Sequence, residues 1–192
     1  MGDPYANDAY VIRRKVFTIF GAKFHVYDSS GQVVLFSKQK AFKLKEDIRV
    51  FSDESEQEER LLIKARQIID FSAAYDVVDA RSGSKIGAFR RKGFTSILRD
   101  SWEFLDTADR VIGTILEDSM FMALLRRFLT NLIPQSFHAQ VGGKDVAKYH
   151  QNFNPFVYKL RVNLEPQARS AVDPQLILAG GILLAAIEGR QG

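Results

Sequence analysis

The sequence predicts a single all-β domain, a closed antiparallel barrel around a buried hydrophobic helix at the C-terminus. Short segments of alternating apolar and polar residues, separated by turns that contain glycine and aspartate, are typical of antiparallel strands. The apolar run Leu176–Ile187 has no polar side, so it must be enclosed all round. No proline- or glycine-rich linker divides the 192 residues into two domains.

The terminal helix is the element with the strongest signal. Asp173 can cap its start and Pro174 suits the first helical position. The apolar run is shorter than the ~20 residues that cross a membrane, and burying its aliphatic side chains gains at most roughly 10–20 kcal/mol. Gly180, Gly181, Ala185 and Ala186 would let a barrel wall approach the helix backbone. The alternative is a helix packed across one face of an open sheet, but its apolarity on all sides favours enclosure.

The strands follow from alternation and from turn chemistry. Lys23–Asp28 places Phe24 and Val26 on one face, and Phe156–Leu164 alternates over its whole length. Similar hairpins, each with an Asp/Gly turn, are predicted over residues 24–36, 74–89, 102–113 and 137–147. Since open sheet edges invite pairing with other chains, closure into a barrel is the expected solution.

Three segments interrupt this pattern. The acidic stretch Ser52–Glu59 is predicted to be a solvated loop or a short capped turn, and Ser119–Ile133, ended by Pro134, is predicted to be a helix. Residues 1–9 are expected to form a flexible tail. The barrel domain is then residues 10–188, with its central helix over 174–188 and a short tail over 189–192.

The composition limits the possible functions. The net charge of +4 permits contact with anionic lipid or nucleic acid, and the absence of cysteine excludes disulfides, thiolate catalysis and cysteine–zinc sites. The N-terminus has none of the basic and apolar regions of a signal peptide. We therefore expect a cytoplasmic protein.

The order of these motifs resembles the LURP-one-related family, which belongs to a superfamily with the phospholipid scramblases and the tubby carboxy-terminal domain. The likeness runs from Tyr10 to Glu188, and the segments that carry it are Arg13–Asp28, Ser29–Gly31, Phe42–Phe51, Ile86–Lys92 and Asp173–Glu188. The resemblance implies a closed antiparallel barrel of about twelve strands around the C-terminal helix. It does not imply an enzyme.

Two departures separate the chain from the scramblases. Where scramblases carry an acidic calcium-binding stretch before the terminal helix, residues 163–172 contain only Glu165 as an acidic residue, too few oxygen ligands for calcium. The cysteine-rich acylation segments are also missing. A scramblase-like membrane protein that uses the terminal helix as an anchor is thus the least favoured alternative.

No catalytic residue, metal site or cofactor is predicted. His25, His138 and His150 lack the spacing of metal ligands, and His25 and His138 are expected on the outer surface. The chain has no Gly-x-Ser-x-Gly motif, and Gly142–Asp145 lacks the residues of a phosphate-binding loop, so tight turns explain these glycines and serines better.

Basic clusters give the better functional indication, because they recur where strands end. The candidate anion- or lipid-binding residues are Arg90, Arg91, Lys92, Lys38, Lys40, Lys43 and Lys45, with Arg13–Lys15 as a further cluster. Gathered at one rim of the barrel, they would attract anionic phospholipid or phosphoinositide headgroups at the inner membrane surface. Phe42, Phe89 and Phe94 would then insert beside them.

The alternatives are cations that only keep the strands solvated, and a module that binds an unidentified protein without any lipid affinity. Nucleic acid is disfavoured as a partner, because stacking needs exposed aromatic rings and most phenylalanines fall on core faces. The sequence thus predicts a non-enzymatic binding or scaffold module.

Overall fold

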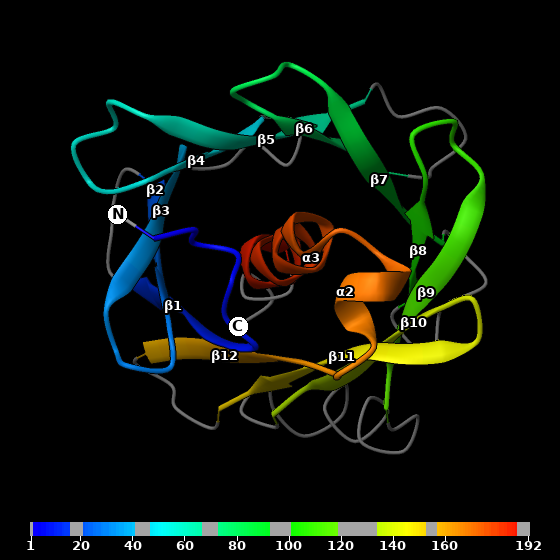
Figure 1. Cartoon of the computed structure of the whole chain (residues 1–192). Helices are drawn as coiled ribbons and strands as arrows, with labels where there is room; N and C mark the ends of the chain where they lie inside the picture. Colours follow the sequence, from blue (N-terminus) through cyan, green and yellow to red (C-terminus); the bar gives the residue numbers. More distant parts are fainter. Residues whose placement is uncertain are drawn as a thin grey trace.

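A computed structural model describes residues 2–15, 21–40, 47–66, 73–92, 101–118, 134–152 and 157–187, and they form a closed barrel of twelve antiparallel strands (Figure 1). This confirms the predicted fold class. The strands are β1 (Ala9–Lys15), β2 (Gly21–Tyr27), β3 (Val33–Lys40), β4 (Ile48–Phe51), β5 (Glu59–Ala65), β6 (Ala74–Asp79), β7 (Lys85–Arg91), β8 (Ser101–Leu105), β9 (Val111–Glu117), β10 (Ser136–Val141), β11 (Lys144–Gln151) and β12 (Val157–Leu164).

Each strand pairs with its neighbours in the sequence, and the barrel closes where β1 pairs with β12. The register at the closure sets Tyr10 opposite Val162 and Ile12 opposite Leu160, all four buried. Alternate residues point outward, as the strand period requires. The alternation predicted for the last strand is confirmed by Tyr158, Leu160 and Val162, which are buried on its inner face.

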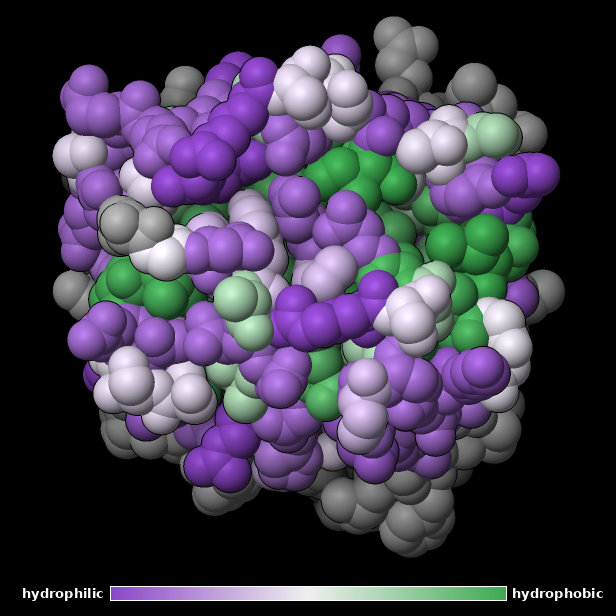
Figure 2. Space-filling model, in the orientation of Figure 1, coloured by the Kyte–Doolittle hydropathy of each residue, from purple (hydrophilic) through white to green (hydrophobic). Residues whose placement is uncertain are grey.

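The two ends of the barrel differ. One end, called the turn end below, carries the turns that join β2 to β3, β4 to β5, β6 to β7, β8 to β9 and β10 to β11. Viewed along the barrel axis from the side of α2 (Ala168–Ala171), this end is covered mostly by hydrophilic residues (Figure 2). The odd-numbered strands run away from the turn end and finish at the opposite end.

Helix α3 (Pro174–Ile187) runs through the barrel and forms the centre of its core (Figure 1). All of its residues from Leu176 to Ile187 are buried. Asp173 caps the helix as predicted, because its Oδ1 accepts a hydrogen bond from the backbone N–H of Gln175 at 2.8 Å.

The small residues of α3 let the wall come close. A methyl group added at Gly180 would lie 3.0 Å from the Phe89 ring, and one added at Gly181 would lie 2.9 Å from Ile12. The buried Tyr149 hydroxyl donates a hydrogen bond to the carbonyl oxygen of Ile177 at 3.0 Å, and burial raises the pKa of this tyrosine. The prediction of an enclosed helix is therefore confirmed.

Two further segments were predicted apart from the strands and the terminal helix. The helix expected over residues 119–133 lies outside the described residues. The N-terminal stretch expected as a flexible tail contacts α2, because the Arg169 guanidinium donates hydrogen bonds to the carbonyl oxygens of Tyr5 and Asn7 at 3.0 and 2.9 Å. Among the described residues, no helix has both the length and the hydropathy needed to cross a membrane.

Candidate functional site

The fold brings the predicted basic clusters to the same end of the barrel but not to one place. Strands β1, β3 and β7, which carry Arg13–Lys15, Lys38 and Arg90–Arg91, all finish at the end opposite the turns, and Lys92 directly follows β7. Strands β4, β5 and β6 separate β3 from β7 around the wall. The side chain of Lys40 and the whole of Lys43 and Lys45 lie outside the described part of the chain.

The Arg90–Lys92 triplet is engaged by its neighbour β8. Arg90 Nη2 lies 2.5 Å and Lys92 Nζ 3.4 Å from the two carboxylate oxygens of Glu103, whose side chain is only 12% exposed. Arg91 alternates to the inner side, where its guanidinium carbon lies 5.7 Å from the centroid of the Trp102 ring. A buried carboxylate thus offsets much of the charge that this triplet could offer to an anionic ligand.

The expectation that Phe89 inserts into a membrane is wrong. Phe89 is fully buried inside the barrel and packs against Phe104, with 5.0 Å between the ring centroids. Because side chains alternate along β7, an outward Arg90 requires an inward Phe89. Phe42 and Phe94 lie outside the described residues.

Three exposed cations on β1 and β12 form a different group, called the basic wall below. They are Arg13 on β1 and Lys159 and Arg161 on β12, and Arg13 lies directly opposite Lys159 across the closure of the barrel. Among the described residues, none of the three has a carboxylate partner at ion-pair distance. Sequence reasoning missed this group, because only the β1–β12 register brings the two ends of the chain together.

The acidic segment Ser52–Glu59 forms the turn from β4 into the start of β5, as predicted, and its residues 53–57 are exposed. Its carboxylates nevertheless contact side chains of the neighbouring strands. Glu54 Oε1 lies 2.7 Å from His25 Nε2, Glu56 Oε1 lies 3.4 Å from Lys38 Nζ, and Glu59 Oε2 lies 2.6 Å from Arg49 Nη1. The segment therefore folds back over the outer face of β2, β3 and β4. This position explains why His25, predicted to be a surface residue, is only 6% exposed.

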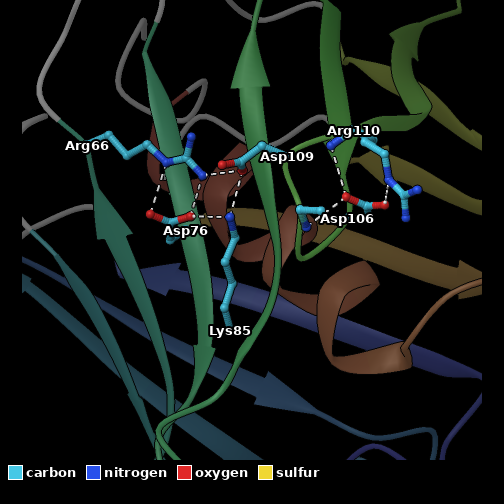
Figure 3. A network of polar contacts seen from close by, with 7 residues as sticks. Arg66, Asp76, Lys85, Asp106, Asp109 and Arg110 are labelled. Carbon is cyan, nitrogen blue, oxygen red and sulfur yellow. Dashed lines mark hydrogen bonds and ion pairs between the residues drawn. The ribbon is translucent and has the colours of Figure 1, made fainter.

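On the wall formed by β5, β6 and β7, Arg66 and Lys85 are paired with Asp76 and Asp109 in a closed network (Figure 3). Arg66 Nε and Nη2 donate to Asp76 at 2.9 and 2.5 Å, and Lys85 Nζ donates to Asp109 at 2.6 Å. Arg66 also bonds Asp109, so the turn between β8 and β9 is held against this wall. Hydrogen bonds from Arg66 and Lys85 lower the pKa of Asp109. Burial alone would raise the pKa of Asp76, but the same two cations outweigh it and leave the pKa lowered.

A polar pocket of about 230 Å³ opens at the turn end, beside the start of α3. Tyr5 Oη, Arg60 Nε and Gln175 Oε1 belong to side chains that line it, and these three buried atoms have no hydrogen-bond partner among the described residues. Burial raises the pKa of Tyr5. The lining contains three arginines and three aspartates, which are Arg60, Arg81, Arg169, Asp3, Asp79 and Asp173. Because the lining carries equal numbers of positive and negative charges, the pocket favours neither anions nor cations as ligands.

The histidines make pairwise contacts that do not form a catalytic relay. Ser136 Oγ lies 2.7 Å from His150 Nδ1, whereas the Asp118 carboxylate contacts a different histidine, His138, at 2.5 Å. A serine nucleophile needs its base and the orienting carboxylate on the same histidine. Within the described residues, no group of three potential metal ligands is found.

Comparison with known proteins places the chain by its family alone. No curated protein and no solved structure matches it significantly. The family model described as LURP-one-related matches residues 33–185, which is more than half of the chain and extends from β3 into α3. The protein with this closed barrel and its central helix therefore belongs to the LURP-one-related family.

Proposed function

We propose that this protein is a non-enzymatic binding module that associates peripherally with anionic phospholipid or phosphoinositide headgroups through the basic wall. The observation that carries the proposal is the set of exposed cations Arg13, Lys159 and Arg161 on two adjacent strands, which have no carboxylate partner in the part of the chain that the structure describes. Like charges directly opposite each other in a sheet destabilise it. Their juxtaposition is thus better explained by an external anion than by the stability of the barrel.

The expected strength of this contact follows from membrane electrostatics. A basic residue close to an anionic leaflet contributes about 1 kcal/mol, and the attraction falls off within a Debye length of about 10 Å at 0.1 M salt. The three cations of the basic wall would therefore give weak, reversible and salt-sensitive binding. Arg90 and Lys92 are secondary contributors in this proposal, because they share the carboxylate of Glu103.

Liposome co-sedimentation tests the proposal. We compare phosphatidylcholine vesicles with vesicles that also contain phosphatidylserine or a phosphoinositide, at low and at moderate salt. The double variant Arg13→Gln/Arg161→Gln should bind anionic vesicles roughly thirtyfold more weakly than the wild type, since two contributions of about 1 kcal/mol are lost. A matched control, Arg110→Gln/Lys144→Gln, removes the same charge from exposed positions at the turn end and should bind like the wild type.

The three vesicle types distinguish the sources of the anionic group. Equal binding to both anionic vesicles would support general attraction to an acidic leaflet, and binding to the phosphoinositide vesicles alone would support headgroup recognition. No binding to any vesicle would overturn the proposal and leave the alternative, a module that binds a protein partner and has no lipid affinity.

A further inference from the structure

A second set of cations lies on the outer face of β2, β3 and β4, directly beside the basic wall. Lys23 is opposite Lys38, and Lys38 is opposite Arg49, so three like charges stand in one line across three strands. We call these residues the cation row. Opposed like charges repel, and the line persists because negative charge lies next to it.

That negative charge comes from the acidic segment of the same chain. Glu54 contacts His25 and lies 3.8 Å from Lys23, Glu56 contacts Lys38, and Glu59 contacts Arg49. Each cation of the row thus has its own carboxylate. Three carboxylates held against three cations reproduce what a phosphate-bearing surface would offer to the same site.

The contacts differ in how easily they can be replaced. Glu59 is the first residue of β5 and its side chain is 24% exposed, so it belongs to the barrel wall. Glu54 and Glu56 lie in the turn, and their side chains are 57% and 38% exposed. The ion pairs of Glu54 with Lys23 and of Glu56 with Lys38 are exposed on both sides, so they contribute little, are screened by salt, and can be displaced by a competing anion.

The backbone of the turn shows that it does not rest in a relaxed conformation. Glu56 has a φ of 57°, in the left-handed region that a residue other than glycine rarely adopts. A backbone hydrogen bond from Ser52 N to Glu58 O at 2.9 Å closes the base of the turn. Rotation of the Glu54 and Glu56 side chains away from the cation row would leave this hydrogen bond unchanged.

Aromatic rings lie beneath the acidic segment. His25 and Phe36 are almost fully buried on the outer face, with 5.2 Å between their ring centroids, and Lys23 Nζ lies 5.9 Å from the centroid of Phe36. Arg13 of the basic wall is directly opposite His25. If Glu54 and Glu56 moved away, the cation row and the basic wall would form one surface with aromatic rings within it. Cations beside aromatic rings suit the interface of an anionic membrane.

We propose that the acidic segment is a built-in competitor for anionic phospholipid, and that Glu54 and Glu56 occupy the cation row until an acidic membrane displaces them. This inference rests on the proposed lipid-binding function and adds its regulation. It assigns Lys23, Lys38 and Arg49 as further headgroup contacts that are masked in the free protein.

The test is the double variant Glu54→Gln/Glu56→Gln, compared with the wild type by co-sedimentation on phosphatidylcholine vesicles that contain phosphatidylserine. The control variant Asp8→Asn/Asp145→Asn removes the same charge from exposed positions at the turn end. Circular dichroism and thermal denaturation verify that all three proteins are folded. We expect Glu54→Gln/Glu56→Gln to bind about fivefold to tenfold more tightly, and the control to change less than about twofold.

The outcomes separate this inference from the proposed function. Binding by Glu54→Gln/Glu56→Gln that exceeds binding by both the wild type and the control supports the inference. Equal binding by all three proteins overturns the inference but leaves the proposed function intact. If none of the proteins binds anionic vesicles, the proposed function fails and this inference fails with it.

A second measurement tests whether the cation row makes the contact with the membrane. Adding Lys38→Gln to Glu54→Gln/Glu56→Gln should remove most of the gained affinity, because the unmasked row loses its central cation. If the triple variant keeps the full gain, the cation row is not the contact and the inference is overturned.

Discussion

The inner face of β1 and β12 is apolar and tightly packed, whereas the outer face is charged and exposed, although residues of the two faces alternate along the same strands. On the inside, Ile12 and Val162 are fully buried, and a methyl group added at Gly181 would lie 2.9 and 3.0 Å from them. On the outside, Arg13 and Arg161 are exposed without a carboxylate partner in the described part of the chain. The inner face determines the fold, and the outer face is free to determine binding.

The outer face is itself of two kinds. Around β5, β6 and β7, Arg66 and Lys85 are tied to Asp76 and Asp109 in one network, so charge there contributes to stability. On β1 and β12, by contrast, Arg13, Lys159 and Arg161 have no carboxylate partner among the described residues. The predictions below test this division, from the largest expected change in the free energy of unfolding to the smallest.

The largest effect is expected on the inner face. Gly181→Leu would force a branched side chain against Ile12, Val162 and Tyr149, and overpacking of this kind should lower the free energy of unfolding by about 3 kcal/mol. Gly181→Ala is the control, because alanine favours the helix by about 1 kcal/mol and offsets the smaller crowding. Urea denaturation measures both. A Gly181→Leu protein as stable as the wild type would show that the core is loose.

An intermediate effect is expected in the paired network. Asp76→Ala leaves Arg66 and Lys85 with one carboxylate instead of two, and should cost about 1–3 kcal/mol of the free energy of unfolding. Arg13→Ala, on the basic wall, should change the free energy of unfolding by less than about 0.5 kcal/mol. Equal losses in the two variants would remove the distinction between the walls.

The same network predicts how stability depends on pH. The pKa values of Asp76 and Asp109 are lowered in the folded protein, so the unfolded chain binds more protons in acid. Their contribution is complete above the ordinary aspartate pKa of about 3.9 and is lost as the pH falls through the lowered values. Urea denaturation across this range should give a flatter curve for Asp76→Asn/Asp109→Asn than for the wild type. The same pH dependence of stability in both proteins would contradict its assignment to Asp76 and Asp109.

The smallest effect compares two outward cations with different neighbours. Lys159 faces Arg13, whereas Lys64 faces Asp76. Arg13→Gln should therefore raise the free energy of unfolding at low salt by a few tenths of a kcal/mol, and Lys64→Gln should lower it by a similar amount, as thermal denaturation would measure. Both differences should fade at high salt. Changes of the same sign would show that net charge, and not the local register, determines the effect.

Local patterns were enough to predict the elements of the fold. The alternation from Val157 to Leu164 and the apolar run from Leu176 to Ile187 are each readable within one segment, and the structure confirms both. The turn at Asp28–Gly31 follows in the same way, since Asp28 Oδ1 accepts the N–H groups of Ser30 and Gln32, both at 2.9 Å.

The candidate site was harder to predict, because it depends on which strands meet and in which register. Nothing near Arg13 in the sequence indicates that Lys159 lies opposite to it. The contact of Glu54 with His25 likewise needs β2 and β4 to lie on either side of β3. Charged residues that lie close together in the sequence therefore predicted only part of each group that the fold brings together. The inward position of Phe89 was nevertheless readable from alternation with Arg90.

The position of α3 after the last strand has a consequence for folding. Tyr10 pairs with Val162 where the barrel closes, and the helix that fills the barrel follows that strand in the sequence. Contacts so distant in sequence slow folding, and strands without a core expose apolar surface in the meantime. We expect the barrel to refold slowly and to benefit from chaperones that cover this surface. Because residues Leu176 to Ile187 are all buried, removing even the last turn of α3 would take away part of the hydrophobic core and not a dispensable tail.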